Sequence, residues 1–493
     1  MKILLIDPPF YRFIGYYNRY FPLGLTYLAA VLRREGHEVS IYDADFTKEA
    51  SEIEFSFLEK KYPEYVAGLN NLEHPIWQEA KKVINQFKPD WVGITAMTTK
   101  MGSAFRLAEI SKECNSNLVV IMGGPHPTLR PEEVLRNSKA VDLVVRGEGE
   151  RIISELVKPK SFLKNIKGIS YRDHGQIVHN PSPEPIQELD SLSIPARDLL
   201  ISEKFYAPEE MGLLMTSRGC PFQCTFCSSK GIWGRGIRYR SVDSVIKEIE
   251  EVIQIYGTKQ FSLKDDIFTL NKERVIEFCQ KLKQRKININ WDCNVRVGLI
   301  DKDLLRLMKK TGCNGVKIGI ESGNQRILDL MKKGITVEQI EKTAKILSKS
   351  GIHWTGYFMM GLPTETKEEI KDTLCLMKRI KPDYASISVY EAFPGTELFE
   401  IGIEKGLVQR ERGLKGFYSI SPKYYYNKDI HYRIDTMSDE EFQKLEEDIK
   451  EAFHRYNMGL PRLIKRVRAR SKIYLREPKT LFGDIKKFLA WAS

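Results

Sequence analysis

Short apolar runs alternate with amphipathic helical patterns over the first 150 residues. Residues 2–7 are almost entirely apolar and are followed by Pro8 and Pro9, which predicts a buried strand. Residues 22–34 place their apolar side chains on one helical face, and Gly36 follows as a stop signal. Similar patterns predict strands at 38–43, 91–97, 117–124 and 141–150, helices at 102–114 and 131–137, and a mostly helical insertion at 47–88.

Alternation of this kind predicts an α/β fold, with a Rossmann-like doubly wound parallel sheet between two layers of helices. Such sheets bind ligands at the carboxyl ends of their strands, where the strand order reverses. Polar and glycine-rich segments stand at these ends, at 95–99, 123–128 and 146–150. A nucleotide, a flavin or a corrin fits this pattern. The GxGxxG fingerprint is missing after the first strand, which disfavours a dinucleotide.

The second half of the chain predicts a different α/β architecture. A hairpin is expected at 168–180 and a proline-rich connector after it. Six strands are expected beyond residue 211, at 212–218, 259–265, 288–295, 315–322, 353–360 and 384–391, with helices at 242–256, 272–285 and 337–350. Six such units predict a partial (β/α)6 barrel of TIM type, open on one side, with its chemistry on the loops after the strands. The expected division is a first domain at 1–180, a linker at 181–210, the barrel at 211–395, and a mainly helical C-terminal region with a basic tail at 396–493.

Three of the eight cysteines are clustered. Cys220, Cys224 and Cys227 have the spacing CxxxCxxC directly after the first barrel strand. Thiolates select iron–sulfur clusters, zinc or cuprous copper, and a structural zinc site normally requires a fourth Cys or His at suitable spacing. No such residue follows nearby. Three thiolates on a four-iron cluster leave one iron without a protein ligand, and a substrate or cofactor can occupy that position.

Composition and charge narrow the function classes. A chain of 493 residues is expected to have two or three domains. No run of about 18 uncharged apolar residues and no signal peptide is recognisable, so a cytoplasmic location is expected. The net charge is +12, and residues 458–493 hold ten Lys or Arg against two acids. The rest is only mildly basic, so no nucleic-acid binding is expected.

The basic tail mixes Leu, Ile, Phe and Trp with its cations. This composition fits a basic amphipathic helix that lies on an anionic membrane surface, which would make the protein membrane-associated. It also fits a solvated helix that packs one apolar face on the barrel.

The cysteine segment resembles the signature of radical SAM enzymes, with the aromatic Phe226 just before the last cysteine. The resemblance implies that Cys220, Cys224 and Cys227 hold a [4Fe–4S] cluster whose open iron binds S-adenosylmethionine (SAM). Further segments resemble the family's SAM-contacting strand ends, at 264–269, 319–323, 356–366 and 392–398. The SAM contacts implied by these matches are Phe226, Lys264, Asp265, Glu321, Ser322, Gly361 and Pro363.

The first domain resembles the N-terminal domain of cobalamin-dependent members of this family. The matching segments are 7–10, 21–39, 94–100, 123–128 and 146–150. The cobalamin contacts implied by these matches are Pro9, Leu23, Gly24, Thr95, Thr98, Thr99, Gly123, Gly124, Pro125, His126, Gly147 and Glu148. The Asp-x-His-x-x-Gly motif of methionine-synthase-type domains is absent. We therefore expect no histidine on the cobalt and a lower corrin face covered by residues near Thr98 and Thr99.

The resemblance to class B methyltransferases implies methyl transfer from methylcobalamin to an unactivated carbon through a 5′-deoxyadenosyl radical, with no protein side chain assigned as catalytic beyond the cofactors. It also implies a small-molecule substrate, for which the tail suggests a lipid or isoprenoid, and an external flavodoxin- or ferredoxin-like electron donor. Corrin and SAM are expected to share one cavity, near a loop with Tyr11, Tyr16, Tyr17 and Tyr20. The alternatives are a radical cyclisation or rearrangement without methylation, as in anaerobic porphyrin-ring cyclases, and a cobalamin sensor or carrier. A further alternative is an enzyme that modifies nucleic acid and uses the tail as an RNA-binding arm.

Overall fold

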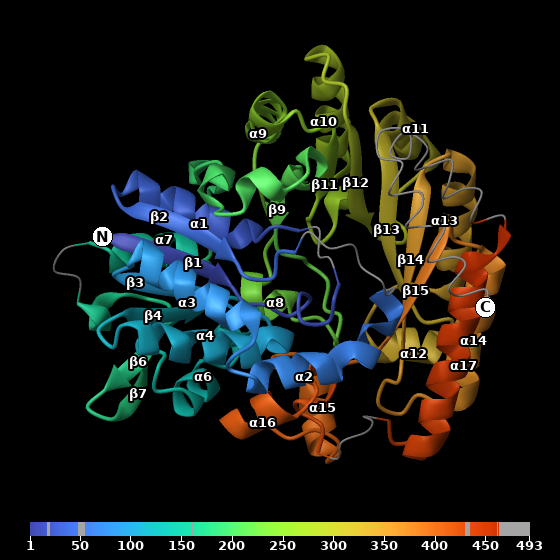
Figure 1. Ribbon diagram of the computed structural model, residues 1–493. Coiled ribbons are helices and arrows are strands. Elements are labelled where there is room, and N and C mark those ends of the chain that lie inside the picture. The colour runs from blue at the N-terminus through green and yellow to red at the C-terminus, as the bar shows by residue number, and fades with distance from the viewer. Residues whose placement is uncertain (17–19, 48–54, 159–161, 429–433, 461, 463–493) are drawn as a thin grey trace.

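The computed structural model describes residues 1–16, 20–47, 55–158, 162–428, 434–460 and 462. Two sheets organise these residues, one in each half of the chain, and Figure 1 shows them facing each other across the middle of the molecule. The basic tail expected to be an amphipathic helix lies outside the described residues from 463 onward. No helix of the described residues is long and apolar enough to cross a membrane.

The first sheet has seven strands in the order β2-β1-β3-β4-β5-β6-β7. Its five parallel strands are β1 (Lys2–Asp7), β2 (Glu38–Asp43), β3 (Trp91–Thr95), β4 (Val119–Gly123) and β5 (Leu143–Val145), and the antiparallel hairpin β6 (Ile169–Asp173) and β7 (Gln176–His179) extends it. The order reverses between β1 and β3, so the expected doubly wound sheet is confirmed. The strand ends at Asp7 and Thr95 lie at this switch point.

Alternate residues of β1 enter two separate cores. Ile3 and Leu5 face the core that includes α1 (Leu23–Arg34) and α7 (Gly149–Leu156), while Leu4 and Ile6 face the core that includes α3 (Pro75–Phe87) and α4 (Met101–Cys114). A strand buried on both faces reads as a continuous apolar run, which explains why this segment was predictable. The remaining helices of this half are α2 (Tyr62–Asn70), α5 (Pro125–Leu129) and α6 (Pro131–Asn137). The described part of the predicted insertion is helical.

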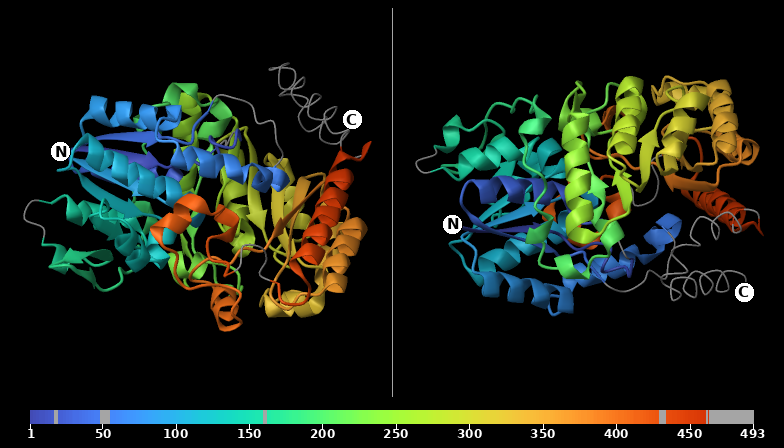
Figure 2. Two further views of the ribbon diagram at one scale, coloured as in Figure 1. Left: turned by 60° about the horizontal axis from the view of Figure 1, so that its bottom comes forward. Right: turned by 90° about the horizontal axis from the view of Figure 1, so that it is seen from above.

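The second sheet is an open barrel of six parallel strands in the order β15-β14-β13-β12-β11-β8. Its strands are β8 (Leu213–Leu214), β11 (Gln260–Leu263), β12 (Asn290–Val295), β13 (Cys313–Glu321), β14 (His353–Met360) and β15 (Tyr384–Val389). Its helices are α8 (Ser229–Trp233), α9 (Val242–Tyr256), α10 (Lys272–Gln284), α11 (Lys302–Lys310), α12 (Gln325–Leu330), α13 (Val337–Ser350) and α14 (Lys367–Ile380). Viewed from above in Figure 2, the longer of these helices lie on the outside of the barrel, whereas α8 lies between the two halves (Figure 1) and contacts α5.

One expected barrel strand is interrupted. Residues 212–218 form β8 and then β9 (Ser217–Arg218), which pairs with β10 (Arg238–Tyr239) instead of the barrel. The break follows from Asp265, which accepts a hydrogen bond from the backbone N–H of Thr216 at 2.6 Å. A backbone N–H bound to a side chain is lost to the sheet.

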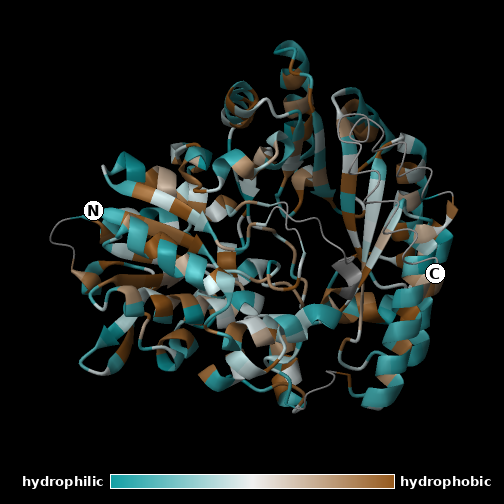
Figure 3. Ribbon diagram, viewed as in Figure 1, coloured by the Kyte–Doolittle hydropathy of each residue, from teal (hydrophilic) through white to brown (hydrophobic). Residues whose placement is uncertain are grey.

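The C-terminal region packs on both halves. Its helices are α15 (Glu397–Glu404), α16 (Leu414–Ser419) and α17 (Asp439–Met458). Helix α16 contacts α2 and α4 of the first half, whereas α17 packs on β15 and α14 of the barrel. Figure 3 shows mainly hydrophobic residues along the strands of the first sheet, mixed residues along the barrel strands, and mainly hydrophilic residues along α17.

Candidate functional site

The cysteine loop follows β9 and is fastened at its centre. The backbone N–H of the buried Thr225 donates to the carbonyl of Met331 at 2.9 Å, and the Thr225 carbonyl accepts from the N–H of Leu398 at 3.0 Å. The Thr225 hydroxyl donates to the carbonyl of Leu330 at 3.1 Å. The loop is thereby fixed to segments that lie about a hundred or more residues away in the sequence.

The three thiols lie within electrostatic range of one another. Burial raises the pKa of Cys220, and it raises the pKa of Cys227 to about 11, while N–H groups of Phe222 and Ser229 act in the opposite direction on these two sulfurs. Metal ligation requires the thiolate, so a cation at this loop would reverse the effect of burial. The described residues contain no group of three His, Cys, Asp or Glu already arranged to hold a metal ion. Three partly accessible thiols with N–H donors nonetheless fit a cluster, and their ligation of iron stays a prediction.

Asp265 binds the strand that leads into the cysteine loop. Its carboxylate accepts hydrogen bonds from the Thr216 N–H at 2.6 Å, the Thr216 hydroxyl at 2.5 Å and the Ser217 hydroxyl at 2.7 Å. The residue is 1% exposed, and both carboxylate oxygens are used within the chain. In this structure Asp265 therefore positions the strand that leads into the cysteines, and the expected SAM contact is untested.

Glu321 and Phe226 are brought together by Lys333. The ammonium of Lys333 lies 2.6 Å from Glu321 and 5.7 Å from the ring centroid of Phe226. Glu321 has a φ of 66°, in the left-handed region that non-glycine residues rarely adopt. Two of the expected SAM contacts, Glu321 and Phe226, therefore lie near the same lysine, as their assignment to one cofactor requires.

The segment after β14 is shaped by a buried acid that the sequence analysis did not single out. Glu365 accepts hydrogen bonds from the N–H groups of Gly361 at 2.6 Å and Leu362 at 3.1 Å. Burial raises the pKa of Glu365 to about 8 against these two bonds. Its second oxygen, Oε1, is buried without a hydrogen-bond partner in the described part of the chain. Gly361 has a φ of 80°, and a Cβ there would lie 2.7 Å from the ring of Phe442, so only glycine fits.

A cavity of about 750 Å³ opens between the two sheets. Its lining comes from the ends of β1 and β3, the start of α1, and barrel strands β12 to β15. Tyr11, Tyr16 and Tyr20 line it as the expected tyrosine loop, whereas Tyr17 lies outside the described residues. The ligand-binding edges of both sheets thus face one shared space.

Comparisons with known proteins agree with this arrangement. The model of the B12 binding domain matches residues 14–157, and that of the Radical SAM superfamily matches residues 214–377. The uncharacterized methyltransferase PH0819 of Pyrococcus horikoshii is 39% identical over 416 residues, which cover 83% of this chain and 84% of that protein. The chain belongs to the cobalamin-dependent radical SAM enzymes. Cobalamin, SAM and a [4Fe–4S] cluster are the cofactors of this family, which confirms the expected set.

Three further proteins are similar to the chain, one in sequence and two in structure. Anaerobic magnesium-protoporphyrin IX monomethyl ester cyclase of Rubrivivax gelatinosus is 31% identical and covers 81% of this chain and 70% of that protein. Among solved structures, the radical SAM methyltransferase TsrM of Kitasatospora setae has a TM-score of 0.62 at 19% identity, over 83% of this chain and 79% of TsrM. The cobalamin-dependent enzyme OxsB has a TM-score of 0.69 at 18% identity, over 99% of this chain and 72% of OxsB. These two structures confirm the fold.

Part of the expected cobalamin set reaches the cavity of this radical SAM enzyme. Gly24, Thr95 and Pro125 line it, as does Lys264 from the expected SAM set. A Cβ built on Gly24 meets no atom within 4 Å, so a side chain there would extend into open space. Gly124 has a φ of 101°, and a Cβ on it would lie 2.8 Å from the Thr95 hydroxyl, which lets β3 and β4 end close together. These features suit a broad cofactor laid across the strand ends.

The other residues expected to contact cobalamin do not line this cavity, and their contacts stay predictions. They are Pro9, Leu23, Thr98, Thr99, Gly123, Gly124, His126, Gly147 and Glu148.

His126 is covered by the C-terminal region. It is 1% exposed, its Nδ1 lies 3.1 Å from the Thr98 hydroxyl, and its ring stacks on Tyr426 at 6.3 Å between centroids. Burial lowers the pKa of His126 to about 3, so the ring is neutral near neutral pH. Nothing in this geometry directs His126 at the cavity.

Glu148 belongs to a buried ion network between the two halves. Its carboxylate lies 2.7 Å from the guanidinium of Arg218 and also pairs with Arg238. Arg218 pairs in addition with Glu150. All four side chains are less than a tenth exposed. Arg218 stands two residues before Cys220, so this network ties the first domain to the start of the cysteine loop.

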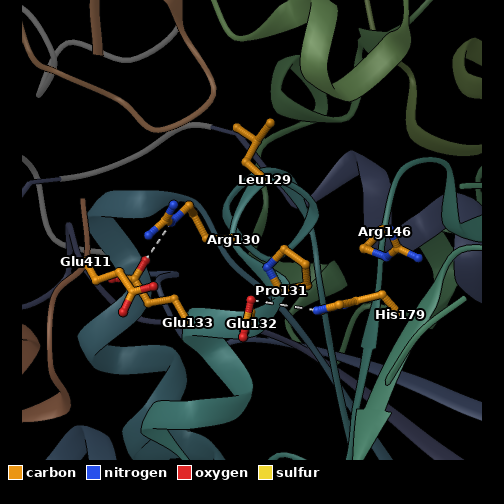
Figure 4. Close-up of a pocket in the computed structure, with 8 residues that line it drawn as sticks. All are labelled: Leu129, Arg130, Pro131, Glu132, Glu133, Arg146, His179 and Glu411. Carbon is orange, nitrogen blue, oxygen red and sulfur yellow. Dashed lines mark hydrogen bonds and ion pairs between the residues drawn. The ribbon is translucent and has the colours of Figure 1, made fainter. Parts of the chain in front are cut away.

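A second, smaller pocket of about 210 Å³ lies beside α6 (Figure 4). Arg130 pairs with Glu133 at 3.1 Å, and His179 lies 4.0 Å from Glu132 across it. The Arg146 side chain donates to the carbonyls of Ile169 and Asn180. The charged side chains of this pocket therefore have partners within the chain. None of the residues expected to bind a cofactor lines the pocket.

Proposed function

We propose that this protein is a C-methyltransferase that acts on an unactivated carbon of a small molecule. The family's cofactors supply the methyl group and the 5′-deoxyadenosyl radical that removes the hydrogen. The observation that carries the proposal is the single cavity lined from both sheets, because a radical site and a methyl donor must reach the same carbon. The name of the relative PH0819, a methyltransferase that covers most of the chain, supports the same choice.

Different residues of the chain would hold the cluster and the corrin. Cys220, Cys224 and Cys227 would hold the cluster, and Asp265 fixes the strand that leads to them. Gly24, Thr95 and Pro125 would accommodate the corrin on the first-domain side of the cavity. The protein needs no general base for this reaction, since hydrogen abstraction by a radical requires none.

The proposal also includes an electron donor, a cellular location and a role for each part of the chain. A flavodoxin- or ferredoxin-like protein would deliver electrons, and the enzyme would work in the cytoplasm without nucleic acid. The functional division would be cobalamin binding at 1–180, a linker at 181–210, the SAM barrel at 211–395 and the helical C-terminal region at 396–493. The tail from residue 463 would rest on an anionic membrane surface, which would bring a lipid or isoprenoid substrate within reach.

Anaerobic reconstitution tests the function. The protein, loaded with iron, sulfide and hydroxocobalamin, is incubated with a reductant and SAM that carries a deuterated methyl group. Products of small-molecule and lipid extracts are then analysed by mass spectrometry. A methyltransferase adds one labelled methyl group to a product and forms 5′-deoxyadenosine. Cys224→Ala should abolish SAM cleavage while the protein still binds corrin, and cleavage by that variant would refute the cluster assignment.

A radical cyclisation or rearrangement is the second candidate. The 31% identity to a cyclase over 81% of this chain favours it. In the same assay this candidate predicts 5′-deoxyadenosine and a product that lacks the labelled methyl group. A sensor or carrier would form neither product.

A further inference from the structure

Two lysines stand on the barrel wall of the shared cavity. Lys264 directly follows β11 and Lys317 lies in the middle of β13, and both line the cavity. Tyr20 of the first-domain loop and Tyr357 of β14 line the same region and are each about two-fifths exposed. This wall therefore combines two positive charges with two aromatic rings.

Lys317 is held in place by an acid. Its ammonium lies 2.6 Å from Asp292, whose carboxylate also accepts a hydrogen bond from the Ser262 hydroxyl at 2.9 Å. Burial lowers the pKa of Lys317, but Asp292 outweighs it and the net shift is upward, so the side chain stays charged. An ammonium has three donors, and Asp292 is the one acceptor assigned to it among the described residues.

Lys264 has no such acid. No carboxylate of the described residues lies within 4.0 Å of its ammonium, which stands 3.5 Å from the ring centroid of Tyr20. Burial and the nearby Lys317 lower the pKa of Lys264, against smaller opposing effects of Tyr20 and Asp292. A partly buried cation without an acid costs free energy, and an anion bound beside it would offset that cost.

On the first-domain wall of the cavity, by contrast, the cation has acid partners. Lys100 lies 2.7 Å from Asp7 and 3.0 Å from Asp45, so two acids share one cation at the ends of the first-domain strands. The cation of the first-domain wall is therefore already paired within the chain, whereas Lys264 on the barrel wall has no acid partner among the described residues.

We propose that the substrate carries a carboxylate or phosphate group that Lys317 and Lys264 bind at the barrel wall, with an apolar or aromatic body against Tyr20 and Tyr357. The inference rests on the proposed function and names the substrate class for that site: an amphiphilic organic anion.

SAM also carries a carboxylate, and Lys264 is one of its expected contacts, so the distinction between substrate and SAM rests on Lys317. Lys317 precedes Glu321 by four residues on the same strand, which separates them by about 13 Å at ~3.3 Å per residue. Glu321 lies beside Lys333 and the cysteine loop, where the cluster would bind SAM. Lys317 is therefore deeper in the barrel than the part expected to hold SAM.

The charge of the labelled product tests the inference. Reconstituted holoenzyme and SAM with a deuterated methyl group are incubated with small-molecule extract of the source cells, which is first divided on an anion exchanger into retained and unretained pools. We expect the labelled product only in the reaction with the retained, anionic pool. Label confined to the unretained pool would overturn the inference and leave the proposed methyl transfer intact. Absence of label from both pools, with 5′-deoxyadenosine formed, would refute the proposed methyl transfer and this inference with it.

Lysine variants separate substrate from SAM. Lys317→Met should raise the KM for the anionic pool about tenfold or more, because a charged hydrogen bond contributes about 1.5–3 kcal/mol. Lys317→Arg should recover most of the loss. The control Lys342→Met, on the exposed face of α13, should keep the KM of the native enzyme. If Lys317→Met instead weakens SAM binding and leaves the KM for the pool unchanged, the anion is the SAM carboxylate and the inference fails.

Discussion

The guanidinium of Arg218 lies 2.7 Å from the carboxylate of Glu148, although the two residues are seventy positions apart and belong to different halves of the chain. Both are almost fully buried, and Arg238 and Glu150 complete the network. Since the cysteine loop begins directly after Arg218, the packing of the two domains and the start of the cluster site depend on the same side chains.

Glu148→Gln should therefore destabilise the enzyme by about 3 kcal/mol, because it leaves two buried arginines short of one negative charge. Denaturation under anaerobic conditions measures the change in the free energy of unfolding. The matched control is Glu132→Gln, whose partner Arg136 is about half exposed, and which should cost less than about 0.5 kcal/mol. Equal effects for both variants would show that the network is not structural. Loss of cobalamin from Glu148→Gln without loss of stability would favour a direct corrin contact instead.

Asp265→Asn should lower the iron content of the reconstituted enzyme. The amide retains one acceptor oxygen, so the three hydrogen bonds from Thr216 and Ser217 cannot all be kept, and the strand before Cys220 loosens. Iron and sulfide per chain measure the effect, and the cobalamin content should remain that of the native protein. Asp303→Asn, an exposed residue of α11, is the control. Full iron occupancy in Asp265→Asn would mean that the loop is fixed by Thr225 alone.

Periodic elements were predictable because their signals are local. Helix α9 has the predicted bounds, since Ser241 caps its start through the N–H of Ser244 and Gly257 ends it in the left-handed conformation. The prediction of one continuous strand at 212–218 was wrong, because the break in this strand depends on Asp265, which lies almost fifty residues away.

The candidate site was predictable only in part, for the same reason. The cysteine spacing and Gly24 are visible in single segments, whereas the role of Glu148 depends on Arg218 and Arg238 from the other half of the chain. Likewise, nothing near His126 indicates that Phe417 and Tyr426 cover it. The sequence analysis did not predict Lys317 as a site residue, because the lysine lies within a mainly apolar strand and only the folded barrel places it on a cavity.

Glu365 predicts a pH dependence of stability. Its pKa is raised by burial to about 8 from an ordinary 4.5, so between these values the folded state keeps a proton that the unfolded state has lost. This contribution to stability is complete below about pH 4.5 and is lost as the pH rises through about 8, with a slope of at most ~1.4 kcal/mol per pH unit. Urea denaturation of the native protein and Glu365→Gln across this range measures it. The glutamine variant, which keeps an acceptor for Gly361 and Leu362, should show a flatter profile, and identical slopes would contradict the assignment.

Gly24→Leu should separate cofactor binding from folding. Gly24 lies in the first turn of α1 and lines the cavity, and a Cβ at this position meets no atom within 4 Å. The leucine side chain would therefore extend into the space proposed for the corrin, while the helix gains a residue of higher helical propensity, worth up to about 1 kcal/mol. We expect unchanged or slightly increased stability of the cofactor-free protein, together with a cobalamin content after gel filtration at least tenfold lower. Gly413→Leu, at the start of α16 and equally free of neighbours around its Cβ, is the control and should retain cobalamin. Retention of cobalamin by Gly24→Leu would place the corrin in another part of the first domain.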